Sequence, residues 1–163
     1  MQYILPELRD SIEKGLPDYI VSKDIMNAGG REKNNHFQIR KSEEWGTGRY
    51  DFHYEIQQNK KDPNVFYIRI DCHFNPYEPH KNRAEYIERY GEADVWDRLD
   101  KMREIGDMVD ETVGRVLRRQ WRYNSLWAAK WDLSIYKGME QVEKKVLAII
   151  RDTTTLIDRV NKD

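Results

Sequence analysis

The fold is decided by two stretches, Arg49-Tyr-Asp-Phe-His-Tyr-Glu-Ile-Gln57 and Val65-Phe-Tyr-Ile-Arg-Ile-Asp-Cys-His-Phe74. Apolar and polar residues alternate along both of them, and this period of two residues is typical of a half-buried β-strand. The segment between them, Asn59-Lys-Lys-Asp-Pro-Asn64, is composed of residues that favour tight turns. The sequence therefore predicts an antiparallel hairpin with one apolar face and one polar face.

The polar face of this hairpin carries enough charge to predict how the two strands pair. Its titratable residues are Asp51, His53, Glu55, Arg69, Asp71 and His73. If Glu55 lies opposite Arg69, then His53 lies opposite Asp71, and Asp51 lies opposite His73. A shift by two residues would instead place Asp51 against Asp71, and two like charges directly opposite each other destabilise a sheet. We therefore predict the first register.

Further strands extend the hairpin on both sides. Residues 36–40 alternate again, with Phe37 and Ile39 on one face, and residues 41–48 contain two glycines that suit a turn into the central strand. Residues 121–137 are ambiguous, because Trp127 and Trp131 have helical spacing while Trp131, Leu133 and Ile135 alternate as on a strand. We predict a fourth strand over residues 130–136, and so an antiparallel meander of three to four strands.

The remaining periodic segments predict helices. Residues 4–15 form a short amphipathic pattern with Pro6 in the first turn, residues 17–28 suit either a second short helix or irregular coil, and residues 80–90 suit another helix. Heptad-like apolar stripes over residues 93–120 and 139–160 predict two long helices, the first running to about residue 124. Since both apolar stripes need cover, we predict an α+β domain spanning residues 1–163, with the two long C-terminal helices on one face of the meander. A homodimer seam is the alternative use of the stripes.

Composition excludes several classes of protein. The chain has 163 residues, of which 39% are hydrophobic and 35% charged, and its formal net charge is −1, so the overall charge does not indicate a type of partner. Its single cysteine, Cys72, cannot form an internal disulfide. No stretch approaches the ~20 apolar residues of a membrane span, and no basic and apolar leader stands at the N-terminus. We expect a cytoplasmic protein that does not enter a membrane.

The first candidate for chemistry is the polar face of the hairpin, with His36 beside it. Imidazole and carboxylate groups on neighbouring strands converge on one face, so His53, Asp71 and His73 are candidate ligands of a divalent metal ion. Such an ion would activate water in a hydrolase. The alternative is a solvent-exposed sheet face on which these charges pair with one another.

The second candidate is a basic and aromatic segment, residues 113–131, which contains no acidic residue. Its basic and aromatic members are Arg115, Arg118, Arg119, Arg122, Trp121, Tyr123, Trp127 and Trp131. On a helix the arginines lie three and four residues apart and form one stripe, and the aromatic rings suit stacking on bases. The alternative is that the arginines pair with acidic residues of neighbouring helices while the tryptophans fill the core.

From these two candidates we expect a non-enzymatic binding module that recognises a protein or a nucleic acid through the basic and aromatic segment and needs no cofactor. The rival hypothesis is the metal-dependent hydrolase built on His53, Asp71 and His73.

Overall fold

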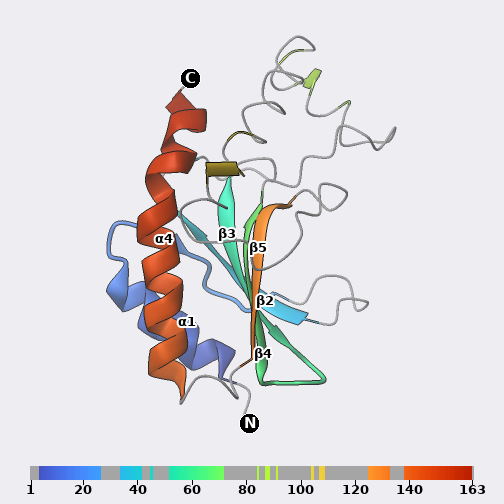
Figure 1. The fold of residues 1–163 in the computed structure, drawn as a ribbon, viewed down its shortest axis with the longest axis vertical. Coiled ribbons are helices and arrows are strands. Elements are labelled where there is room, and N and C mark those ends of the chain that lie inside the picture. The colour runs from blue at the N-terminus through green and yellow to red at the C-terminus, as the bar shows by residue number, and fades with distance from the viewer. Residues whose placement is uncertain are drawn as a thin grey trace.

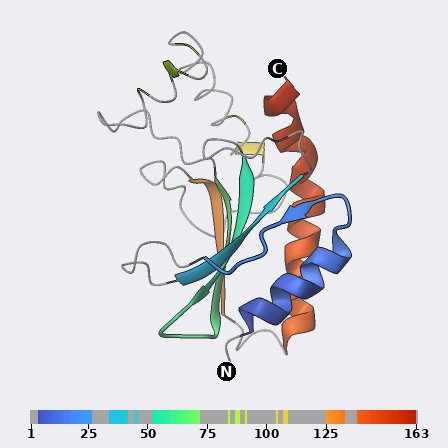
Figure 2. The same ribbon diagram turned by 180° about the vertical axis from the view of Figure 1, so that it is seen from behind.

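The structure, a computed structural model, describes residues 4–26, 34–41, 45, 52–71, 84, 87–88, 91, 104, 107–108, 125–132 and 138–162. Helix α1 (Leu5–Gly15) comes first, and strands β1 (Ile20–Val21), β2 (Asn34–Arg40), β3 (His53–Asn59), β4 (Val65–Asp71) and β5 (Ser125–Asp132) follow. Helix α4 (Met139–Lys162) completes this set. The strands form one antiparallel sheet in the order β1-β2-β3-β4-β5, with α1 and α4 together on one side of it (Figures 1 and 2). The α+β class and the antiparallel meander are confirmed.

The predicted register of the central hairpin is confirmed where the structure describes both strands. Glu55 pairs with Arg69, and His53 pairs with Asp71. A side chain stabilises the turn between the strands. Asn59 Oδ1 accepts hydrogen bonds from the backbone N–H groups of Lys61 and Asp62 at 2.8 and 3.0 Å, in place of a backbone carbonyl. The third predicted pair, Asp51 with His73, lies outside the described residues.

Other predicted elements shift or change type. Within residues 17–26 we expected a helix or coil, but Ile20 and Val21 form a short strand that pairs with Arg40 and Ile39. The fourth strand exists, but it begins at Ser125 rather than at residue 130, so the helical spacing of Trp127 and Trp131 was misleading. Residues 133–136 of the predicted strand lie outside the described residues. Most of the helix expected over 93–120 lies outside the described residues, so of the two long C-terminal helices only α4 is described at length. Its predicted bounds of 139–160 are nearly correct.

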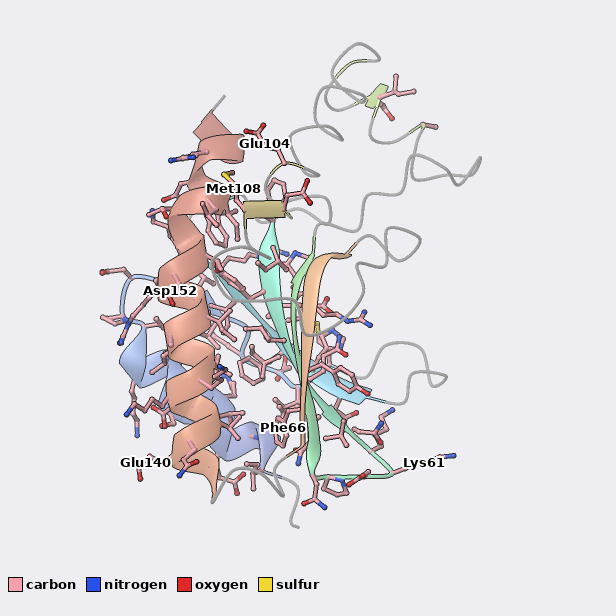
Figure 3. The ribbon with its side chains drawn as sticks, viewed as in Figure 1. Lys61, Phe66, Glu104, Met108, Glu140 and Asp152 are labelled. Atoms are coloured by element: carbon pink, nitrogen blue, oxygen red, sulfur yellow. The ribbon has the colours of Figure 1, made fainter. Side chains whose placement is uncertain are left out.

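The core lies between the sheet and the two helices. The sheet contributes buried side chains from one face, the face predicted to be apolar, and Phe37, Ile39, Phe52, Tyr54, Ile56, Phe66, Ile68 and Ile70 are among them. Helix α4 contributes Val142, Val146 and Ile149, which belong to the predicted stripe, and also Ile150 and Ile157, which lie beside it. Phe66 marks this layer, whereas Lys61 marks the exposed β3–β4 turn at the far end of the sheet (Figure 3).

Helix α1 begins at a buried glutamine of the sheet. Its N-cap position, Ile4, offers no side-chain cap, so the first backbone N–H groups need another acceptor. Gln58 Oε1 accepts the N–H groups of Ile4 and Leu5 at 3.1 and 3.2 Å, and Gln58 Nε2 donates to the Pro63 carbonyl at 2.8 Å. One fully buried side chain on β3 therefore joins the start of α1 to the hairpin turn.

Hydrogen bonds between hydroxyl groups join α4 to the sheet, and the donor and acceptor of each can be assigned. Thr153 and Thr154 donate their protons to the carbonyls of Ile149 and Ile150 at 2.7 and 2.6 Å, because a carbonyl only accepts. Each threonine oxygen is then left as an acceptor, so Tyr54 donates to Thr153 at 2.7 Å and Tyr19 donates to Thr154 at 2.8 Å. Burial raises the pKa of Tyr54, and this keeps its hydroxyl protonated and able to donate.

Close packing holds the two helices together. A Cβ atom at Gly15, the last residue of α1, would lie 3.2 Å from Cδ1 of Leu147 on α4, which is tighter than an ordinary contact. At the other end of α4, Asp158 accepts hydrogen bonds from Lys41 at 2.5 Å and from the indole of Trp45 at 2.9 Å.

Among the helices of the described residues, none has the length and apolar character required to cross a membrane.

Candidate functional site: the polar face of the sheet

The sheet face turned away from α1 and α4 is buried as well, and this corrects the expectation of a solvent-exposed polar face. His53 is 0% exposed, Gln57 3%, Glu55 4% and His36 6%. Successive strand residues point to opposite faces, so these four cannot share the apolar layer described above. The sheet is therefore buried on both sides around β3, and one of those sides is polar.

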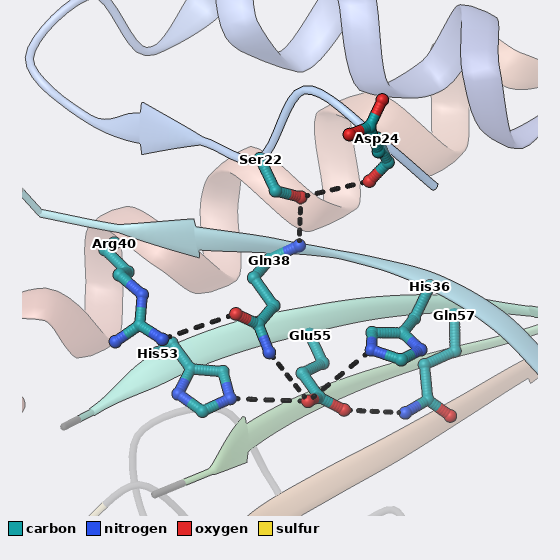
Figure 4. A network of polar contacts seen from close by, with 8 residues as sticks. All are labelled: Ser22, Asp24, His36, Gln38, Arg40, His53, Glu55 and Gln57. Atoms are coloured by element: carbon teal, nitrogen blue, oxygen red, sulfur yellow. Dashed lines mark hydrogen bonds and ion pairs between the residues drawn. The ribbon is translucent and has the colours of Figure 1, made fainter. Parts of the chain in front are cut away.

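Glu55 is the centre of this polar side. Gln57 Nε2 donates to Glu55 Oε2 at 2.9 Å, Gln38 Nε2 donates to Glu55 Oε1 at 3.3 Å, and His53 Nε2 lies 3.3 Å from the same oxygen. His36 Nε2 is 3.9 Å from Glu55 Oε1 and reaches it from the side opposite His53 (Figure 4). We call these five residues the Glu55 cluster.

The arrangement explains how a carboxylate can be buried in this sheet. A buried carboxylate is costly unless hydrogen bonds replace its lost hydration, and here both oxygens accept bonds from neighbouring side chains. An ionised carboxylate has no proton to give, so the contact with His53 requires a proton on Nε2 of that imidazole. Because both oxygens already accept hydrogen bonds, Glu55 is better suited to hold the side chains of the sheet together than to act as a catalytic base.

Backbone pairing brings the cluster together from two strands. Gln38 lies opposite Glu55, and His36 lies opposite Gln57, across the β2–β3 ladder. Gln38 also accepts a hydrogen bond from Arg40 at 3.3 Å, and its backbone N–H donates to Ser22 Oγ at 2.9 Å. The cluster is thereby linked through Gln38 to the segment that follows β1 (Figure 4).

Of the predicted metal ligands, only His53 has a described side chain. It lies inside the Glu55 cluster, whereas Asp71 is described by its backbone at the end of β4, and His73 lies outside the described residues. No group of three or more histidine, cysteine, aspartate or glutamate side chains arranged to hold a metal ion occurs in the part of the chain that the structure describes.

The basic and aromatic segment is described only at its end. Arg115, Arg118, Arg119, Trp121, Arg122 and Tyr123 lie outside the described residues. The backbone of Trp127 belongs to β5, where it is the register partner of Ile70, and Trp131 is the partner of Phe66. Both partners are fully buried residues of the core.

Sequence reasoning named His36, His53 and Glu55 as members of the polar face but did not identify the glutamines as their partners. Gln38 and Gln57 carry no charge, so a search for titratable residues passes over them. One signal was available: Gln38 lies two residues after His36 in one strand, and Gln57 lies two and four residues after Glu55 and His53 in the next, so each glutamine shares a face with these titratable residues.

Comparison with known proteins finds no matching family model, no matching curated protein and no matching solved structure.

Proposed function

We propose that the protein is a binding module that recognises another macromolecule through the basic and aromatic segment, residues 113–131. The observation that carries this proposal is compositional. In a chain with 29 acidic residues this segment has none, and it holds four arginines between Arg115 and Arg122. Such a concentration of cations and aromatic rings suits a phosphate backbone with unstacked bases, or an arginine-rich protein hot spot.

The position of β5 supports the proposal. The segment ends within β5, which is the last strand in the sheet order and pairs with β4. A strand anchored over seven register pairs gives the residues that precede it a rigid attachment to the domain. Binding residues held next to a rigid element lose less conformational entropy when a partner docks.

The proposal is tested by reversing charge within the arginine stripe. We expect Arg118→Glu combined with Arg122→Glu to weaken binding of a labelled single-stranded oligonucleotide at least about tenfold, since two phosphate contacts would become repulsive. Fluorescence anisotropy at several salt concentrations measures this, and differential scanning calorimetry checks that the thermal transition is unchanged. A matched control is Lys144→Glu with Lys145→Glu, which makes the same charge change on the exposed side of α4.

Three results would redirect the proposal. Unfolding of the arginine double variant would show that the arginines are structural. Equal loss of binding in the lysine control would show that only total charge matters. If the wild-type protein binds no oligonucleotide, nucleic acid is rejected, and affinity capture with the same two variants tests a protein partner.

The metal-dependent hydrolase stays as the second candidate because the register places His53 opposite Asp71. It predicts a stoichiometric divalent ion in protein that is purified without chelator, and loss of that ion when His53 and His73 are both replaced by alanine. Elemental analysis that finds no bound metal in the wild-type protein would count against it. Its weak point is that the His53 imidazole is already directed at Glu55.

A further inference from the structure

Arg69 is a half-buried cation whose Nε atom has no hydrogen-bond partner among the described residues. It lies on β4 on the same face as the Glu55 cluster, and its Nε atom is buried. Among the residues that the structure describes, no hydrogen-bond acceptor contacts this atom, and no carboxylate forms an ion pair with the guanidinium. An unpaired charge in such a setting is unfavourable, so the fold keeps a group that its own stability does not require.

The expected partner of Arg69 is engaged elsewhere. Arg69 and Glu55 lie opposite each other in the β3–β4 ladder, which is the pairing that would give an ion pair on charge grounds. The Glu55 oxygens instead accept from Gln38 and Gln57 and contact His53. The Glu55 carboxylate is thus held by neighbours on its own strand and on β2. The Nε atom of Arg69 on β4 has no acceptor among the described residues.

A second unsatisfied nitrogen occurs on the same face. His36 is 6% exposed, and its Nδ1 atom is buried with no hydrogen-bond partner among the described residues. His36 and Arg69 belong to β2 and β4, the two strands that flank β3. The register also offsets them by two residues along the strands, because His36 aligns with Gln57 and Arg69 aligns with Glu55. Two strand spacings and this offset separate their backbones by about 12 Å, a distance that an arginine and a histidine side chain can span between them.

We propose that Arg69, with His36, binds the carboxylate group of a small monoanionic ligand on the polar face of the sheet. A guanidinium presents parallel N–H donors that match the two oxygens of a carboxylate, and the imidazole supplies a further hydrogen-bonding nitrogen. The Arg69 guanidinium and the Glu55 carboxylate carry opposite charges, so a bound monoanion adds one net negative charge to this half-buried setting, whereas a phosphate dianion adds two. The smaller desolvation cost favours the monoanion. This site is independent of the basic and aromatic segment.

The test uses thermal unfolding of the full chain in monocarboxylates (acetate, propionate and benzoate) against sodium chloride of equal ionic strength. We expect at least one carboxylate to raise the transition temperature by about 2–4 °C, because a ligand that binds only the folded state stabilises it. Arg69→Gln should abolish this rise. In chloride alone the same variant should unfold at the wild-type temperature or higher, since it removes a half-buried cation that forms no ion pair with the described residues.

Arg151→Gln is the matched control, because it removes an exposed arginine of α4 and should keep the full carboxylate effect. The proposal is overturned if no carboxylate stabilises the wild-type protein, or if Arg69→Gln retains the rise. It is also overturned if Arg69→Gln lowers the transition in chloride or fails to fold, since Arg69 would then have a structural partner. Stabilisation by sodium phosphate but not by carboxylates, dependent on Arg69, would reject the carboxylate class.

Discussion

The two faces of the sheet are both buried, yet they are held by different interactions. On the face toward α1 and α4, apolar side chains fill the space, and the few polar groups bond to the helices, as Tyr54 does with Thr153. On the other face, side chains of the sheet itself hydrogen-bond to the buried Glu55 carboxylate. The comparison shows that burial and polarity are separate properties of a strand, and that a polar face can be internal if its carboxylate accepts hydrogen bonds from neighbouring side chains.

The hydroxyl network of the helix-facing side is more completely hydrogen-bonded than the polar face. Every hydroxyl proton in the Tyr54 and Tyr19 network has an assigned acceptor. On the polar face, the Nδ1 atom of His36 and the Nε atom of Arg69 have no acceptor or donor among the described residues. A native fold tolerates few such groups, and this difference is why we place the proposed ligand site on the polar face rather than among the hydroxyls.

The largest effect should come from removing the centre of the polar face. We expect Glu55→Ala to lower the free energy of unfolding by about 3 kcal/mol or more, because Gln38, Gln57 and His53 would all lose their shared acceptor in a buried site. Urea denaturation followed by circular dichroism measures the change.

Two controls separate charge from location in that experiment. Glu55→Gln keeps the shape and one accepting oxygen, so it should cost less than the alanine variant. Glu140→Ala removes an exposed glutamate of α4 and should cost about 0.5 kcal/mol or less. Equal costs for Glu55→Ala and Glu140→Ala would show that the Glu55 cluster is not a stabilising unit.

An intermediate effect should follow from replacing Gln58, whose side-chain amide accepts the first N–H groups of α1. We expect Gln58→Leu to cost about 1–2 kcal/mol, since the N–H groups of Ile4 and Leu5 lose their acceptor while a similar volume stays filled. Hydrogen exchange should show faster exchange at these two amides, with little change in the middle of α4. Uniformly faster exchange in both helices would contradict a local capping role.

The smallest effect should come from removing the Tyr54 hydroxyl, which lies on the helix-facing side of the sheet. We expect Tyr54→Phe to cost about 1 kcal/mol, because Thr153 loses a donor but keeps its own bond to the Ile149 carbonyl. Tyr19→Phe, which removes the equivalent donor at the half-buried end of the network, should cost less. Chemical denaturation of the two single variants and the double variant measures whether the two hydroxyls act together.

The Tyr54 hydroxyl should also make the stability of the protein depend on pH in the alkaline range. The pKa of Tyr54 is raised in the folded protein by burial, so above its ordinary value of about 10 the unfolded chain releases a proton that the folded chain keeps. Stability contributed by this group is complete below pH 10 and is lost as the pH rises further. Tyr54→Phe should therefore show a shallower loss of stability above pH 10 than the wild type, and an identical pH profile would contradict the buried, protonated hydroxyl.

The sequence by itself determined the local elements and much of their pairing. Period-two alternation located the central hairpin, complementary charge predicted its register at Glu55 with Arg69 and at His53 with Asp71, and the heptad stripe located α4 to within a few residues. These properties depend on neighbours along the chain or directly across a ladder, so they can be read from residue order. Strand β1 escaped prediction because two residues carry no measurable period, and β5 was displaced because Trp127 and Trp131 fit both a helix and a strand.

Only the tertiary structure decided which faces are internal. The same alternation describes a sheet with one solvated face and a sheet buried on both faces, because the period reports that two faces differ and not what covers them. The charges around Glu55, which the sequence left as an exposed set of ion pairs, form a buried cluster that includes two uncharged glutamines. Glu55 accepts hydrogen bonds from Gln38 on β2 and Gln57 on β3, whereas the sequence had assigned this carboxylate to Arg69 on β4.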